Sequence, residues 1–191
     1  MTEVKQVGHH SPSFEGRVAL VTGAGAGLGR AYAMRLASLG AAVVVNNRGR
    51  PDQPSSAQAV VDEITAAGGT AIADHHSVQF DDQASAMVEL AYNTYGRLDV
   101  LICNAGVSGG GPFHETSSDA FAEVFDVSFY GTLYPMKAAM KRMYDAGYGR
   151  IIGTTSSAGY FPSPGTAAYA AAKTALIGLF RSISGEAIPH G

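Results

Sequence analysis

A tyrosine and a lysine stand four positions apart in the alanine-rich stretch AAYAAAKTAL, residues 167–176. Alanine favours the α-helix, and residues four apart share one helical face, so we expect the side chains of Tyr169 and Lys173 to be neighbours. One interpretation is a surface phenol that packs on a lysine stem. The other is a proton-transfer pair, because a nearby ammonium favours phenolate and lowers a phenol pKa from its usual value of about 10.

Proton transfer at an alcohol or carbonyl also needs a hydrogen-bond donor for the oxygen whose charge changes. Ser156 and Ser157 offer hydroxyl groups at the end of the segment GRIIGTTSS, residues 149–157, whose pattern predicts a strand. Alternate residues of a strand face opposite sides, so only one of the two serines can point toward the tyrosine.

A glycine-rich turn, VTGAGAGLGRA, follows a short apolar run and opens a helical pattern. Glycine permits a tight turn and lets a pyrophosphate approach the backbone and the helix N-terminus. The position between a strand and a helix favours this interpretation over an ordinary flexible turn. The residues of the turn that we predict to bind a dinucleotide are Thr22, Gly23, Gly25, Gly27, Leu28 and Gly29.

The elements that must position these groups alternate along the chain, which predicts an α/β fold with a parallel sheet covered by helices on both faces. The predicted strands are 17–23, 41–47, 70–76, 98–106 and 149–157, and the predicted helices are 28–40, 55–69, 81–96, 118–146 and 167–188. Ligands of such sheets bind beyond the carboxyl ends of the strands. The candidates there are Asn46–Asn47, His75–His76, Asn104–Gly106 and Thr155–Ser156.

Two details of the predicted helices concern their ends and faces. Ser55 and Gln58 have the spacing of a capping box at the start of helix 55–69. A stripe in segment 118–146 indicates core or subunit packing rather than a cofactor site; it consists of Leu133, Met136, Met140, Met143 and Tyr144.

Composition excludes several classes of protein. The chain has 191 residues, 46% of them hydrophobic, which suits one domain over residues 14–191 after a mobile tail over 1–13. The net charge is −3, and acidic and basic residues are scattered along the chain. We therefore expect neither a nucleic-acid nor a membrane partner. The single cysteine, Cys103, excludes an internal disulfide, and we expect it to be a buried side chain rather than a nucleophile. His9 and His10 alone do not make a metal site, and the lack of a signal peptide favours a cytoplasmic location.

Four motifs in this order resemble the short-chain dehydrogenase/reductase family: Thr22-Gly-x-x-x-Gly-x-Gly29, Asn104-Ala105-Gly106, Ser156 and Tyr169-x-x-x-Lys173. The resemblance covers residues 14–191 and implies a Rossmann-like doubly wound sheet and an NAD(P)-dependent oxidoreductase. It implies that Tyr169 is the general acid/base, that Lys173 lowers the tyrosine pKa and holds the nicotinamide ribose, and that Ser156 orients the substrate oxygen. The amino-acid sequence around the motifs is similar to the hydroxyacyl-CoA dehydrogenase part of peroxisomal-type multifunctional enzymes.

The resemblance also implies a small alcohol or ketone substrate and a homodimer or homotetramer that packs through helices 118–146 and 167–188. A hydroxyacyl thioester or a steroid-like alcohol is the substrate that it favours. The further cofactor-binding residues that it implies are Asn47, Arg48, His76, Ser77, Val78, Asn104, Ala105 and Gly106, together with Tyr169 and Lys173.

The sequence departs from the family pattern at several of these positions. Ser128 replaces a helix asparagine that supports the lysine, so we count it with the catalytic residues. At the end of the second predicted strand, Asn47 and Arg48 provide no carboxylate that would reject the 2′-phosphate of NADP, which leaves the choice between NAD and NADP open. His76 replaces the family's adenine-side aspartate, and Cys103 replaces a common asparagine.

The largest departure is that the last strands of the family fold are missing, because the sequence ends where a sixth strand would begin. The chain is then either a piece of a longer enzyme or a short product whose sheet edge needs a partner. The alternative function is a catalytically inactive dinucleotide-binding or scaffolding fragment.

Overall fold

The computed structural model describes residues 12–49, 52–161 and 163–191. Most of the predicted tail, with His9 and His10, lies outside these ranges. The described strands are β1 (Val18–Val21), β2 (Ala42–Asn46), β3 (Thr70–Asp74), β4 (Val100–Cys103) and β5 (Arg150–Gly153). The α-helices are α1 (Gly27–Ser38), α2 (Ser56–Ala66), α3 (Asp81–Tyr95), α4 (Ser118–Phe125), α5 (Gly131–Asp145) and α6 (Ala167–Ala187). The short helical segments are η1 (Phe113–Glu115), η2 (Asp126–Tyr130), η3 (Ser157–Gly159) and η4 (Ile188–His190).

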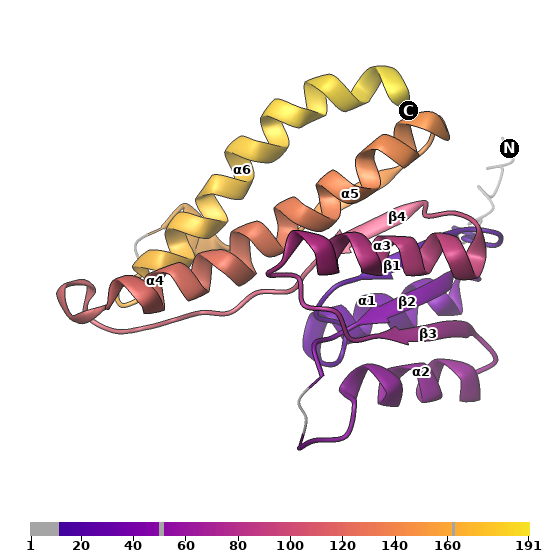
Figure 1. Cartoon of the computed structure of the whole chain (residues 1–191), viewed down its shortest axis with the longest axis horizontal. Coiled ribbons are helices and arrows are strands. Elements are labelled where there is room, and N and C mark those ends of the chain that lie inside the picture. The colour runs from indigo at the N-terminus through magenta and orange to yellow at the C-terminus, as the bar shows by residue number, and fades with distance from the viewer. Residues whose placement is uncertain (1–11, 50–51, 162) are drawn as a thin grey trace, which may run out of the picture.

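The five strands form one parallel sheet in the order β3-β2-β1-β4-β5 (Figure 1). The chain order reverses between β1 and β4, where Val21 pairs with Ile102. Ligands of open parallel sheets bind at such a switch point, beyond the carboxyl ends of the strands. The predicted parallel α/β sheet is therefore confirmed, and its crevice lies beside Thr22 and Asn104.

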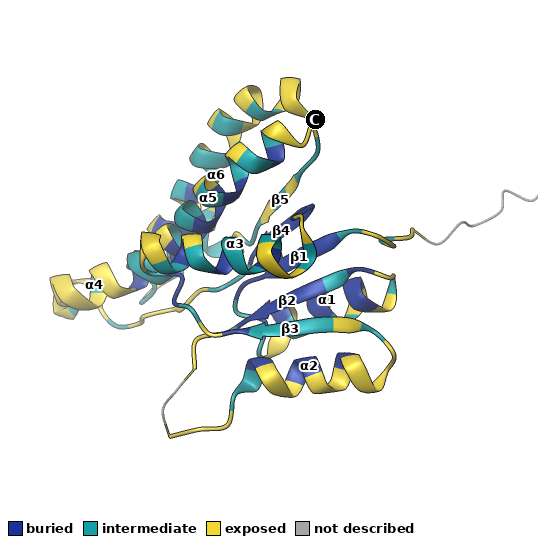
Figure 2. Cartoon of the chain, turned by 45° about the vertical axis from the view of Figure 1, so that its right-hand side comes forward, coloured by how far each residue is buried: buried dark blue, intermediate teal, exposed yellow. Residues whose placement is uncertain are grey.

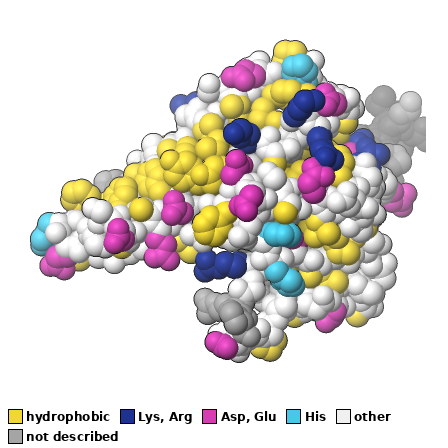
Figure 3. Space-filling model, viewed as in Figure 1, with side chains coloured by type: hydrophobic (Ala, Val, Ile, Leu, Met, Phe, Trp, Pro, Cys, Tyr) yellow, Lys and Arg dark blue, Asp and Glu magenta, His cyan; other side chains and the backbone are white. Residues whose placement is uncertain are grey.

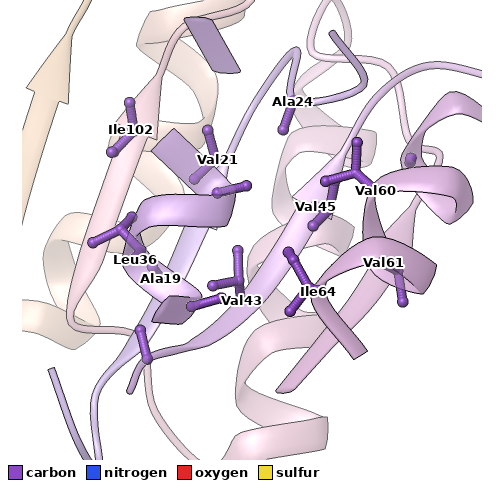
Figure 4. Packing of buried hydrophobic residues seen from close by; sticks show 14 of the residues in the cluster. Ala19, Val21, Ala24, Leu36, Val43, Val45, Val60, Val61, Ile64 and Ile102 are labelled. Carbon is purple, nitrogen blue, oxygen red and sulfur yellow. The ribbon is translucent and has the colours of Figure 1, made fainter. Parts of the chain in front are cut away.

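The core lies on both faces of the sheet, because successive residues of a strand point to opposite sides. Ala19 and Val21 pack with α1 and α2, in a cluster that includes Val43, Val45 and Ile64 (Figure 4). Val18 and Leu20 pack on the other face, where α3 and α5 contribute the buried side chains Met87, Met136 and Met143. The central strands are buried and the outer helix faces are exposed, as Figure 2 shows. The predicted packing role of the methionine stripe is confirmed.

Segment 118–146 is helical throughout most of its length, but it contains a π-helical turn, η2, between α4 and α5. Such turns are rare and often lie at functional sites. Together with α6, this segment forms an arm that extends beyond the sheet (Figure 1). No helix in the described part of the chain is long and apolar enough to cross a membrane.

Several predicted boundaries were wrong by a few residues. β5 ends at Gly153 rather than at residue 157, after which Thr154 N–H makes one further bond to Cys103 O at 3.0 Å. Ser156 and Ser157 therefore belong to a helical turn, and the strand-alternation argument does not apply to them. Only one of the two hydrogen bonds of the predicted capping box forms. Ser55 Oγ accepts a bond from Gln58 N–H, but the Gln58 side chain donates to Asp62 instead of to the Ser55 backbone.

Candidate active site

The glycine turn leads from β1 into α1 and is shaped by close backbone contacts. Gly23 has a φ of +62°, and a Cβ there would lie 2.9 Å from Ala105 Cα. At Gly25 a Cβ would collide with the side chains of Ser56 and Asn47. α1 begins at Gly27, and its N-cap residue, Ala26, makes no side-chain capping bond. The first N–H groups of α1 are thus available to an anion, as a phosphate site at a helix N-terminus requires.

Thr22 and Asn104 fix the turn to the end of β4. The backbone N–H groups of Asn104 and Ala105 donate to Thr22 Oγ1 at 3.0 and 3.1 Å. Asn104 Nδ2 donates in turn to the carbonyl oxygens of Thr22 and Gly23 at 3.1 and 3.2 Å. These predicted cofactor residues therefore hold the crevice open and leave the backbone to contact a ligand.

A cavity of about 280 Å³ lies beyond the ends of β1, β2, β3 and β4. It brings together ten predicted residues: Gly23, Asn46, Asn47, Arg48, His76, Ser77, Val78, Asn104, Ala105 and Gly106. Thr22, Gly25, Gly27, Leu28 and Gly29 belong to the neighbouring turn rather than to the cavity wall. Gln79 and Val127, which were not predicted, also line the cavity, as does Val107. Arg48 Nη1 donates to Gln79 Oε1 at 2.8 Å, and no lining residue carries a carboxylate.

Asp74 is a buried residue beside this cavity that sequence reasoning missed. Its Oδ1 lies 2.6 Å from His76 Nδ1, and its Oδ2 accepts a bond from Asn46 Nδ2 at 2.6 Å. Asn46 Nδ2 also donates to His76 O at 2.9 Å. The spacing of two residues in the strand pattern, which places Asp74 and His76 on one side, was the available signal.

Tyr169 and Lys173 lie on one face of α6, as predicted, with Lys173 Nζ 5.7 Å from the centre of the Tyr169 ring. Lys173 is only 2% exposed, and its Nζ donates to Thr154 O at 2.7 Å. Burial lowers the pKa of the Lys173 ammonium, because the charged form loses solvation. The lysine is thus held in place by the chain that follows β5.

Ser128 lies in η2 and its hydroxyl is engaged by the backbone of Val107. Its Oγ donates to Val107 O at 2.9 Å and accepts from Val107 N–H at 3.1 Å. A Cβ on Gly106 would lie 3.3 Å from Lys173 Nζ and 3.6 Å from Ser128 Oγ. Gly106 therefore lies between the cavity and two of the predicted catalytic residues, and its lack of a side chain leaves space beside them.

Ser156 caps η3, where its Oγ accepts a bond from Ala158 N–H at 3.2 Å. Its hydroxyl proton remains available to a substrate oxygen. Two bonds fix the flanking chain to α6: Thr155 Oγ1 donates to Lys173 O at 3.0 Å, and Thr174 Oγ1 donates to Gly159 O at 3.1 Å. The structure thus fastens the Ser156 segment to the helical turn that carries Lys173, while Ser157 is exposed at the start of η3.

Cys103 is not a nucleophile. It is 1% exposed, and burial raises its thiol pKa to about 12, so the reactive thiolate is suppressed. The expectation of a buried structural cysteine is confirmed. Among the described residues, no group of three or more His, Cys, Asp or Glu side chains could hold a metal ion.

The chain belongs to the short-chain dehydrogenase/reductase family, because the family's profile, described as short chain dehydrogenase, matches residues 17–191. It is 42% identical to the peroxisomal hydratase-dehydrogenase-epimerase of Saccharomyces cerevisiae over 91% of this chain and 20% of that protein. A short chain dehydrogenase from Mycobacterium avium matches with a TM-score of 0.88 and 41% identity, over 94% of this chain and 66% of that one. A 7α-hydroxysteroid dehydrogenase, solved with NADH and 7-oxo glycochenodeoxycholic acid, matches with a TM-score of 0.87 and 29% identity, over 94% of this chain and 68% of that one.

This chain thus spans a fifth of the yeast protein and about two thirds of each of the two solved structures. The residues present fit the dinucleotide that the family implies. The first turn of α1 has no side-chain cap, Gly23 and Gly25 leave no room for a Cβ, and the cavity reaches Gly106 beside Lys173.

Proposed function

We propose that the protein is an NAD(P)-dependent oxidoreductase that interconverts a secondary alcohol and a ketone, with Tyr169 as the general acid/base. The observation that carries this proposal is the placement of Lys173. Its buried ammonium lies beside the Tyr169 ring, is anchored on Thr154 O and adjoins Gly106 at the end of the cavity.

Ser156, Tyr169 and Lys173 have separate roles in the proposed oxidation of the alcohol. Ser156 donates its hydroxyl hydrogen to the substrate oxygen and orients it. Tyr169 removes the hydroxyl proton, and the ammonium of Lys173 lies beside its ring. A dinucleotide held by the glycine turn and the cavity would supply the hydride acceptor for this oxidation. In ketone reduction, Tyr169 returns the proton to the oxygen.

The substrate class that we propose is a hydroxyacyl thioester or a steroid-like alcohol. The names of the relatives support it: a hydratase-dehydrogenase-epimerase and a hydroxysteroid dehydrogenase that was solved with a 7-oxo bile acid conjugate. Exposed apolar side chains follow β4 and η3 and offer contact area for such a substrate; they are Val107, Phe113, Tyr160 and Phe161.

The experiment that tests the proposal compares the wild-type chain with Tyr169→Phe. NADH fluorescence measures cofactor binding, and absorbance at the nicotinamide band measures turnover with 7-oxo glycochenodeoxycholic acid and with a 3-ketoacyl thioester. We expect Tyr169→Phe to lose at least about 100-fold in turnover, because it removes the general acid, and to keep NADH affinity within about twofold. Equal turnover in the two proteins would overturn the assignment.

A catalytically inactive dinucleotide-binding protein is the second candidate. The hydroxyl of Ser128 is engaged by Val107 and makes no bond to Lys173, which favours it. This candidate predicts saturable NADH binding without hydride transfer to either ketone. The same pair of measurements therefore separates the two functions.

A further inference from the structure

The family resemblance places His76 on the adenine side of a bound dinucleotide, and we propose that buried Asp74 determines which base His76 accepts. In this inference His76 Nε2 accepts a hydrogen bond from the exocyclic amino group of adenine. Asp74 is a positioning residue, because it acts through the imidazole. The inference rests on the proposed dinucleotide binding and adds a base selectivity to it.

The contacts around His76 leave one ring nitrogen for a ligand. Nδ1 is 2.6 Å from Asp74 Oδ1, and the Asp74 side chain is 1% exposed. The imidazole itself is 42% exposed and lines the cavity. Within the described residues, no hydrogen bond reaches Nε2. Figure 3 shows histidine side chains at the surface near the end of β3.

The carboxylate of Asp74 fixes the tautomer of the neutral imidazole. A carboxylate only accepts hydrogen bonds, so Nδ1 must carry the hydrogen that it donates to Asp74. A neutral imidazole has one hydrogen on its nitrogens, which leaves Nε2 as an acceptor. The site therefore offers a lone pair to the ligand and matches an amino group better than a carbonyl.

The base end of a dinucleotide is the part that reaches His76. In the proposed binding, the pyrophosphate lies at the uncapped start of α1 and the nicotinamide lies near Lys173. The other end then extends over β2 and β3, where the cavity wall contains Val78 and Ser77 beside His76. Aliphatic contact suits the face of a purine, and a polar group at the edge distinguishes its substituents.

Substitution of Asp74 by asparagine should reverse the selectivity. Both hydrogens of Asn46 Nδ2 are engaged, by Asp74 Oδ2 and by His76 O. An asparagine at position 74 must therefore turn its oxygen toward Asn46 and its amide nitrogen toward His76 Nδ1. Nδ1 then accepts a hydrogen bond, the tautomer changes, and Nε2 carries a hydrogen that matches the carbonyl of hypoxanthine.

The test is a fluorescence titration of the 191-residue chain with NADH and with reduced nicotinamide hypoxanthine dinucleotide, in which a carbonyl replaces the adenine amino group. At pH 8.5, we expect the wild-type chain to bind NADH at least about tenfold more tightly than the hypoxanthine analogue. We expect Asp74→Asn to bind the hypoxanthine analogue more tightly, and His76→Phe to bind both with similar, weakened affinity. Equal affinity of the wild-type chain for the two ligands, or unchanged selectivity in Asp74→Asn, would overturn the inference.

His75→Phe is the matched control. The ring of His75 lies 3.5 Å from Ser55 Oγ and 3.4 Å from Asn47 O, outside the cavity wall. We expect this variant to keep the preference for NADH. Thermal unfolding of each variant identifies any loss of fold. Failure of the wild-type chain to bind either dinucleotide would instead reject the proposed function, so the two failures are distinguishable.

Discussion

At the scale of single residues, Lys173 carries the clearest conflict between stability and function. An almost fully buried ammonium is costly, and its one described hydrogen bond, to Thr154 O, offsets only part of the cost. A side chain of similar length without charge would suit this environment better. The retained charge agrees with the role that we propose for Lys173 beside the ring of Tyr169.

We therefore expect Lys173→Met to lose at least about 100-fold in turnover and to keep or raise the melting temperature. Methionine fills a similar volume and removes the desolvation cost. Turnover and thermal unfolding of the same preparation check the two effects together. A variant that is inactive because it has unfolded, with a melting temperature lowered by about ten degrees or more, would contradict this explanation.

Local pairs at this scale could be predicted and distant pairs could not. The four-residue spacing of Tyr169 and Lys173 is enough by itself to place both on one helical face. The bonds of Ser128 to Val107 span 21 residues and depend on how η2 meets the chain after β4. Sequence alone contains no periodic signal for such a contact.

At the scale of elements, the turn between β1 and α1 is the most constrained segment of the site. We expect Gly23→Ala to destabilise the fold by about 1–3 kcal/mol and to abolish NADH binding. Alanine would be strained at a φ of +62°, and its Cβ would press on Ala105. Urea unfolding and NADH titration measure the two effects.

Gly178→Ala provides the control within α6. Nothing lies within 4 Å of a Cβ at Gly178, and alanine is the better helix former. This variant should gain up to about 1 kcal/mol and keep NADH binding. If both variants lowered stability equally, the strain in the turn would not be the cause.

The starts of β1 and β4 are joined by Asp99, which predicts an acid-sensitive contact. Burial by itself raises the pKa of Asp99, but hydrogen bonds from Arg97, from Val18 N–H and from Arg17 outweigh it, and the net pKa is lowered. A lowered pKa means that the carboxylate stabilises the fold above its unfolded pKa of about 3.9. This stabilisation is lost as the pH falls through the folded value.

Asp99→Asn should therefore lower the free energy of unfolding by about 2 kcal/mol at pH 7. The difference from the wild-type chain should shrink as the pH falls below about 4, because protonation then neutralises the wild-type carboxyl as well. Urea unfolding at pH 7, 4 and 3 measures the difference. A constant gap across this range would assign the effect to packing.

At the scale of the whole molecule, the class of fold followed from alternation along the chain, which is a local property. The lateral order of strands is different, because the pairing of Val21 with Ile102 joins residues about 80 positions apart. Apolar runs of similar length cannot specify which strand lies beside which. The ordered motifs implied a doubly wound sheet through the family resemblance, and the order β3-β2-β1-β4-β5 comes from the structure.

Within the arm, the segment formed by α4, η2 and α5 has a partly exposed aromatic stripe: Phe121, Phe125, Phe129, Tyr130 and Tyr134. Ring centres of successive members lie 5.3–6.0 Å apart. A band of hydrophobic side chains is visible along this arm (Figure 3). Aromatic side chains of this kind are enriched in protein interfaces, which agrees with the proposed homodimer or homotetramer.

Tyr130→Glu should consequently shift the chain toward monomer, because a carboxylate in an apolar contact loses solvation. Tyr32→Glu is the matched control: Tyr32 is 37% exposed, as Tyr130 is, and it lies on α1, which packs on the opposite face of the sheet from α5, so its substitution should leave the assembly unchanged. Light scattering over a range of concentrations measures the mass of each. A monomeric wild-type chain would reject self-association, whereas a Tyr32→Glu monomer would place the contact on α1 instead of the arm.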